Sequence, residues 1–142
     1  MNAALHVILM GMMGGCPISE ADSFKISQLR EVGDYNQVVK LLEPCAQLGN
    51  VKAEFSIGYY MLEWLEDPSA KSKARHQYAD AIEWVYKAAL SGSDQAVGLL
   101  HKAYRFGMFD LPRDQDKMQC WADVQSRRLR AESCEKPFYK KP

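Results

Sequence analysis

"ADAIEWVYKAALSGSDQAVGLLHKAYRFG", residues 79–107, is the stretch that decides the fold. Small and apolar residues recur in its first half at steps of three and four, which places them on one helix face: Ala81, Trp84, Val85, Ala88 and Ala89. Gly92 stands where a left-handed residue after a helix is expected, and Asp94 is predicted to cap the next helix. The helical period then resumes and continues to Gly107. Because helices joined by so short a turn pack antiparallel, the stretch predicts a helical hairpin.

The rest of the chain is also predicted to be helical. Apolar periodicity predicts helices over residues 20–31, 35–48, 51–66, 77–91 and 94–106, and a last helix that begins near Asp114 and carries Trp121 and Leu129. Asp34 is expected to cap the second helix, and Pro44 inside that helix predicts a kink. Gly58 is expected where another helix approaches closely. The polar residues 67–77 are read as a loop or a frayed helix start.

Length and composition bound the class of protein. The chain has 142 residues, of which 47% are hydrophobic, and its formal net charge is zero. This length is typical of one domain with a shared core. A general nucleic-acid binder would carry a basic excess, so the zero charge argues against nucleic acid and leaves specific protein partners open. No stretch reaches the roughly 18 to 20 apolar residues that a membrane span needs.

The N-terminal segment, residues 1–19, has two interpretations. Its apolar run has the length of a signal-peptide core, and Gly14 and Gly15 before Cys16 resemble a bacterial lipoprotein signal, in which that cysteine is lipidated. A lipid on Cys16 would be the one expected link to a membrane. The alternative is an apolar segment that docks on the first hairpin. Export would place the protein in the periplasm or envelope, and the alternative in the cytoplasm. Residues 20–133 form the helical domain, and 134–142 a basic tail expected to be extended.

The chain repeats itself when the residues around Gly49 are aligned with those around Gly92, since small and apolar residues then coincide. One unit spans Ala96, Leu100, Tyr104, Gly107, Leu111, Pro112, Arg113, Asp114, Lys117 and Trp121, and half of another spans Ala81, Trp84, Lys87, Ala88, Ala89 and Gly92. These residues resemble the Sel1-like repeat family, relatives of the tetratricopeptide repeats. The resemblance covers about residues 22–124. It implies an all-α solenoid of about three antiparallel helix pairs, closed by a capping helix.

Three residues depart from that family pattern: His101 and Trp64 replace glycine, and Met61 replaces tyrosine. Within the expected packing, Trp84 and Trp121 fill the seams between units. We therefore expect Trp84→Ala to cost about 3–5 kcal/mol of stability.

Chemistry-bearing motifs are sparse. The three histidines, His6, His76 and His101, lie in different segments without a histidine or cysteine neighbour at metal-ligand spacing. The sequence has neither a Gly-rich phosphate loop nor a Ser-centred nucleophile elbow. We therefore predict no enzyme activity, no cofactor and no metal.

The four cysteines allow several states. If one helix connects Cys120 to Cys134, the two lie roughly 20 Å apart, beyond disulfide reach. Cys16 and Cys45 could meet, because the first helix starts beside the end of the second, and this bridge would compete with lipidation of Cys16. Buried free thiols are the favoured interpretation for Cys45 and Cys120.

Function is then expected on a surface. A curved stack of hairpins presents a concave face lined by the first helix of each pair. The exposed partner-binding residues predicted there are Glu54, Tyr59, Glu63, Gln95, His101, Lys102 and Arg105. The Sel1-like resemblance implies a non-catalytic protein-binding module, either a bacterial envelope adaptor or an immunity-type inhibitor of a secreted toxic effector. The alternatives are an enzyme acting on a cell-wall-related compound and a self-associating structural subunit.

Overall fold

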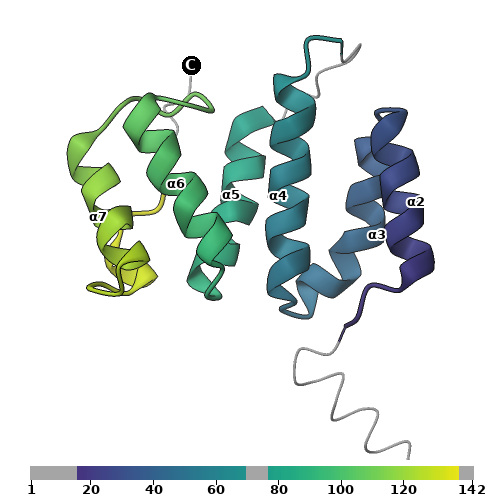
Figure 1. Ribbon diagram of the computed structural model, residues 1–142, viewed down its shortest axis with the longest axis horizontal. Coiled ribbons are helices and arrows are strands. Elements are labelled where there is room, and N and C mark those ends of the chain that lie inside the picture. The colour runs from purple at the N-terminus through teal and green to yellow at the C-terminus, as the bar shows by residue number, and fades with distance from the viewer. Residues whose placement is uncertain (1–15, 70–76, 138–142) are drawn as a thin grey trace, which may run out of the picture.

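The structure is a computed structural model that describes residues 16–69 and 77–137 (Figure 1). All regular elements in these ranges are helical, which confirms the predicted all-α class. The elements are α2 (Glu20–Glu31), α3 (Tyr35–Gln47), α4 (Val51–Glu66), α5 (Gln77–Leu90), α6 (Asp94–Phe106), α7 (Gln115–Gln125) and the 3₁₀ helix η1 (Ala131–Ser133). Each of α2 to α7 packs against its neighbours in the chain, and the helices follow one another across the view in chain order.

Polar side chains cap the helix starts. Asp34, Asn50, Ser93 and Asp114 each accept a hydrogen bond from the backbone N–H three residues further on. Such a bond satisfies one of the backbone donors that a helix start leaves unpaired. The prediction for Asp34 is confirmed. The prediction that Asp94 caps α6 was wrong: Ser93 is the cap, and Asp94 lies in the first turn.

A close approach joins α4 to α5 at Gly58. A Cβ at this position would lie 2.7 Å from the carbonyl oxygen of Ala81 and 2.7 Å from Cγ2 of Val85. Only a residue without a side chain permits this packing distance, as predicted. The turn between α5 and α6 also follows the prediction, because Gly92 has a left-handed backbone (φ 99).

The buried side chains form two clusters. The larger lies among α5, α6, α7 and the second half of α4, and contains Leu62, Ala81, Ile82, Val85, Ala88, Ala89, Ala96, Val97, Leu100, Ala103, Tyr104, Leu111, Trp121, Ala131 and Cys134. The smaller lies among α2, α3 and the first half of α4, and contains Ile26, Val38, Leu42, Cys45, Ala46, Ala53 and Ile57. We call them the C-terminal core and the N-terminal core.

The two indoles expected in seams differ in burial. Trp121 is 1% exposed in the C-terminal core, as predicted. Trp84 is only half-buried, because it lies where α3, α4 and α5 leave an open cleft, and the Lys87 ammonium lies 4.8 Å from its ring centroid. Because Trp84 is only partly buried, we now expect Trp84→Ala to cost less than the roughly 3–5 kcal/mol inferred from the sequence.

The last helix is shorter than predicted. α7 ends at Gln125, and the chain reverses at Arg127, whose backbone is left-handed (φ 63). Leu129 is consequently not on the helix, and its side chain is 40% exposed. The reversal brings Cys134 back to Cys120, and the two form a disulfide with Cα atoms 5.8 Å apart. The expectation that they lie beyond reach was wrong because no single helix connects them.

A second disulfide joins Cys16 to Cys45, with Cα atoms 5.4 Å apart. The Asn50 side-chain amide also donates to the Cys16 carbonyl oxygen at 3.0 Å, so this segment is held beside the end of α3. The free thiols expected for Cys45 and Cys120 are wrong, because each is bridged. Lipidation of Cys16 would require the thiol that this bridge uses. The signal-like residues 1–15 and the end of the basic tail lie outside the described residues.

Candidate functional site

A cleft of about 550 Å³ opens between α3, α4 and α5. We call it the aromatic cleft, since a tyrosine and two tryptophans line it. Its walls are Tyr35, Asn36, Val39, Lys40 and Glu43 of α3, Met61, Trp64 and Leu65 of α4, and Asp80 and Trp84 of α5. Clefts of this size with apolar walls and a few polar groups are the usual form of a binding site.

Helical spacing explains why these residues meet. Tyr35, Val39 and Glu43 follow one another at steps of four, so they form one stripe along α3. Asp80 and Trp84 have the same spacing on α5. The cleft is therefore built from one stripe of each helix, and its shape depends on how the helices pack.

Two of the three aromatic walls are partly exposed, while Tyr35 is buried. The rings of Tyr35 and Trp64 pack against each other with centroids 6.3 Å apart and planes tilted by 40°. Trp64 and Trp84 are half-buried. Large apolar surface left facing a concave opening is available to a ligand.

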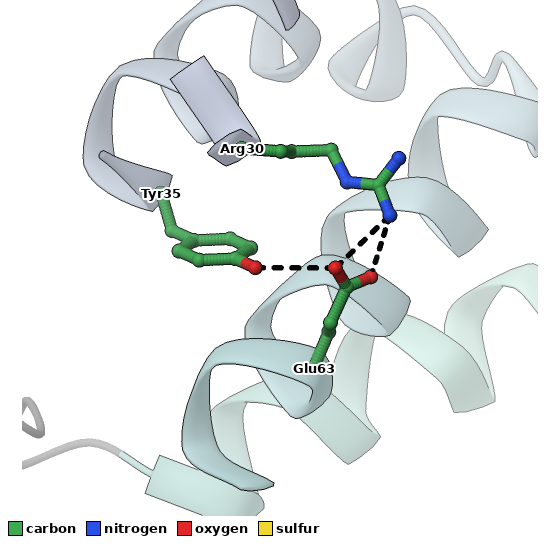
Figure 2. A network of polar contacts seen from close by, with 3 residues as sticks. All are labelled: Arg30, Tyr35 and Glu63. Atoms are coloured by element: carbon green, nitrogen blue, oxygen red, sulfur yellow. Dashed lines mark hydrogen bonds and ion pairs between the residues drawn. The ribbon is translucent and has the colours of Figure 1, made fainter. Parts of the chain in front are cut away.

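A polar network beside the cleft fixes one of its walls (Figure 2). The Arg30 guanidinium of α2 donates from Nη2 to both carboxylate oxygens of Glu63 on α4, at 3.0 Å and 2.7 Å. The Tyr35 hydroxyl donates to Oε1 of the same carboxylate at 3.2 Å. The network joins α2, α3 and α4 through one carboxylate, and we call it the Glu63 network. It orients the Tyr35 ring that lines the cleft.

Two members of the Glu63 network, Arg30 and Tyr35, have raised pKa values. Burial acts to lower the pKa of Arg30, but the hydrogen bond and charge of Glu63 outweigh burial, so the pKa is raised. Burial raises the pKa of the Tyr35 hydroxyl, and the Glu63 carboxylate adds to this rise. The Arg30 guanidinium also lies 4.3 Å from the ring centroid of Tyr60. Because its pKa is raised, the Tyr35 hydroxyl stays protonated and continues to donate its hydrogen bond to Glu63.

The predicted exposure of Glu54 was wrong. Its side chain is 3% exposed and accepts a hydrogen bond from the Ser91 hydroxyl at 3.3 Å. Burial raises the pKa of the Glu54 carboxyl, while Ser91 and Lys87 oppose the rise. The cause is tertiary: the end of α5 covers this face of α4. A buried carboxylate cannot serve as a contact for a partner.

The other predicted partner-binding residues do not form one shared surface. Tyr59 is 42% exposed and packs against Phe55 and Tyr60. Glu63 is used inside the network described above. Gln95 and Lys102 are exposed on α6.

His101 and Arg105 are the two predicted residues that share a hollow. They line a pocket of about 390 Å³ between α6 and α7, together with Arg113, which sequence reasoning did not select. We call this the basic pocket. The two residues lie one turn apart on α6, and the turn that precedes α7 brings Arg113 beside them.

Sequence reasoning selected none of the residues that line the aromatic cleft. A signal was present, because Met61 and Trp64 are two of the three departures from the Sel1-like pattern, and both line the cleft. A large indole in place of glycine is costly to leave half-exposed unless it packs or binds something.

Comparison of the chain with protein-family models, curated proteins and solved structures gives no match. Within residues 16–69 and 77–137, no group of three or more His, Cys, Asp or Glu side chains is placed to hold a metal ion. In the same ranges no helix combines the length and apolar character needed to cross a membrane. The Sel1-like resemblance stays a prediction, and the site is argued from its geometry.

Proposed function

We propose that the chain is a non-catalytic binding module that holds a segment of a partner protein in the aromatic cleft. The observation that carries this proposal is that Trp64 and Trp84, both half-buried, line an open cleft of about 550 Å³ with Tyr35. Tryptophan and tyrosine are the residues that most often dominate binding energy at protein interfaces. The scaffold would be the short Sel1-like solenoid, which the packing of consecutive helices supports.

The charges around the cleft favour one kind of segment. Lys40, Glu43 and Asp80 line it, so carboxylates outnumber ammonium groups there. An apolar side chain inserted beside the indoles would bury the aromatic walls, and a neighbouring Lys or Arg would meet the Glu43 carboxylate. We therefore propose an apolar anchor residue flanked by a basic residue as the ligand.

The cleft is also preorganised. Three helices supply its walls, Gly58 fixes the spacing of α4 and α5, and the Glu63 network orients Tyr35. A site held in place before binding loses less conformational entropy when the partner arrives.

The two disulfides support an oxidising compartment for this role, since such bridges persist in secreted and periplasmic proteins and are rare in the cytosol. We propose the bacterial envelope, where the chain would act as an adaptor or as an immunity-type inhibitor of a secreted toxic effector. Both roles need a protein-binding surface and no catalytic group.

The test is selection of peptides from a random library displayed on phage, with the wild-type chain as bait. Selected peptides should share an apolar anchor and bind the wild type. The variant Trp64→Ala plus Trp84→Ala should bind them at least about tenfold more weakly, because loss of interface aromatics costs more than 1 kcal/mol.

The matched control is Tyr59→Ala, which removes an exposed aromatic residue of α4 that does not line the cleft. It should bind like the wild type. Melting curves by circular dichroism will establish that each variant is folded. Equal binding by the tryptophan variant, or loss of binding in Tyr59→Ala alone, would reject the cleft in favour of the face predicted from the sequence.

A further inference from the structure

The basic pocket between α6 and α7 has a chemistry opposite to that of the aromatic cleft. We propose that it binds the carboxylates of an acidic segment in the partner protein. This inference rests on the proposed protein-binding function and adds a second contact of stated charge. Its residues are His101, Arg105, Arg113 and Gln115, with apolar Met118 at the wall.

No acidic residue lines the basic pocket. The ion pairs in the described part of the chain are Arg30–Glu63 and Lys136–Glu83, and neither pocket arginine takes part. The acidic residues beside the pocket do not line it, although Asp123 is bonded to Gln119, which does. Asp114 caps α7 and lines a different pocket with Asp116, and Asp123 accepts a hydrogen bond from Gln119. Two arginines therefore line one hollow that no acidic residue of the described ranges lines.

The arginines are also positioned. Arg113 donates from Nε to the backbone oxygen of Arg105 at 3.1 Å, which ties its guanidinium to the end of α6. The Arg105 guanidinium lies 5.1 Å from the ring centroid of Phe106. Both groups keep their terminal N–H donors available for a ligand, and this planar fork matches the two oxygens of a carboxylate.

An acidic peptide fits these observations better than a nucleic acid. The chain has a formal net charge of zero, and a phosphate backbone requires an extended row of cations. The pocket offers two arginines and one histidine in about 390 Å³, which suits one or two carboxylates.

The experiment titrates the full chain with fluorescein-labelled hexaglutamate and follows fluorescence anisotropy at low ionic strength. The wild type should bind, and Arg105→Gln plus Arg113→Gln should bind at least about tenfold more weakly, as expected for lost charge-assisted hydrogen bonds. The control Arg128→Gln plus Arg130→Gln makes the same charge change at two exposed arginines outside the pocket and should bind like the wild type. Equal loss in both double variants, or no binding by the wild type, overturns the proposal.

Two further arms separate the alternatives. A single-stranded oligonucleotide of equal charge should bind more weakly than hexaglutamate; tighter binding that depends on Arg105 and Arg113 would overturn the choice of an acidic protein segment. The variant Trp64→Ala plus Trp84→Ala should bind hexaglutamate like the wild type. Its result therefore separates failure of the basic pocket from failure of the aromatic cleft.

Discussion

The N-terminal core and the C-terminal core are stabilised in different ways. The C-terminal core has fifteen buried residues, including the large side chains of Trp121 and Tyr104. The N-terminal core has seven, and Leu42 and Ile57 are its largest fully buried members. A small core buries little apolar surface and needs other support. Each core carries one disulfide, and the N-terminal core has the Glu63 network as additional support.

Helix α4 belongs to both cores. Ala53 and Ile57 lie in the N-terminal core, Leu62 lies in the C-terminal core, and Met61 packs against both. The aromatic cleft opens at this boundary, since its walls come from α3 on one side and α5 on the other. The proposed binding site therefore lies where two separately built cores meet.

The largest expected effect is on the C-terminal core. Trp121→Ala should lower the free energy of unfolding by about 3–5 kcal/mol, because it leaves a cavity in place of a fully buried indole. Trp84→Ala should cost less, about 2 kcal/mol, since its side chain is only partly buried. Urea unfolding followed by circular dichroism measures both values. Similar losses for the two variants would contradict the difference in burial between Trp121 and Trp84.

Removal of each disulfide should cost roughly 3 kcal/mol, because a bridge restricts the unfolded chain. The two variants are Cys16→Ala plus Cys45→Ala and Cys120→Ala plus Cys134→Ala. If the N-terminal core depends on its bridge as described, the first variant should raise amide hydrogen exchange in α2 and α3 while α6 and α7 stay protected. Exchange that rises evenly along the chain would show that the two cores unfold as one.

Gly58→Ala tests the contact between α4 and α5. The added Cβ would lie 2.7 Å from backbone and side-chain atoms of α5, so the helices must move apart, at a cost of about 1–3 kcal/mol. Gly98→Ala is the control, because its Cβ would meet only Gln125 Nε2, at 3.6 Å. That change should stabilise α6 by about 0.5–1 kcal/mol. The two melting temperatures should therefore shift in opposite directions. If both variants raised or both lowered the melting temperature, the close approach of α4 and α5 would be contradicted.

Glu63→Gln tests the polar support of the N-terminal core. The Arg30 and Glu63 side chains are 32% and 36% exposed, so solvent screens their attraction and we expect a loss of about 1 kcal/mol. The same variant should weaken peptide binding in the cleft, because Tyr35 exchanges a charged acceptor for a weaker neutral amide oxygen. Unchanged stability together with unchanged peptide affinity would remove the Glu63 network from the account.

The smallest effect is a pH dependence from buried Glu54. Its pKa is raised by burial, so the folded state favours the protonated form. Below the ordinary value of 4.5 both folded and unfolded states are protonated and burial costs nothing. As the pH rises through the raised pKa, the wild type loses stability. The advantage of Glu54→Gln over the wild type should therefore grow from acidic to neutral pH, and an advantage that shrinks would contradict the burial.

Local signals in the sequence predicted most of the fold. The helix bounds, the cap at Asp34 and the close approach at Gly58 each depend on residues within one or two turns. The Cys120–Cys134 bridge was missed because residues 126–130 contain neither glycine nor proline, the residues that usually indicate a reversal of the chain. The burial of Glu54 was missed because it depends on Ser91, far away in sequence. The cleft was missed for the same reason, since three helices supply its walls.

The most direct measurement is a nitrogen–proton correlation spectrum of the ¹⁵N-labelled chain during titration with a selected peptide. The chain has three tryptophans, so three indole N–H signals report separately on the cleft and the core. The account predicts that the signals of Trp64 and Trp84 shift as the peptide saturates, while the signal of buried Trp121 stays in place. Saturation with unmoved Trp64 and Trp84 signals would contradict the aromatic cleft as the binding site.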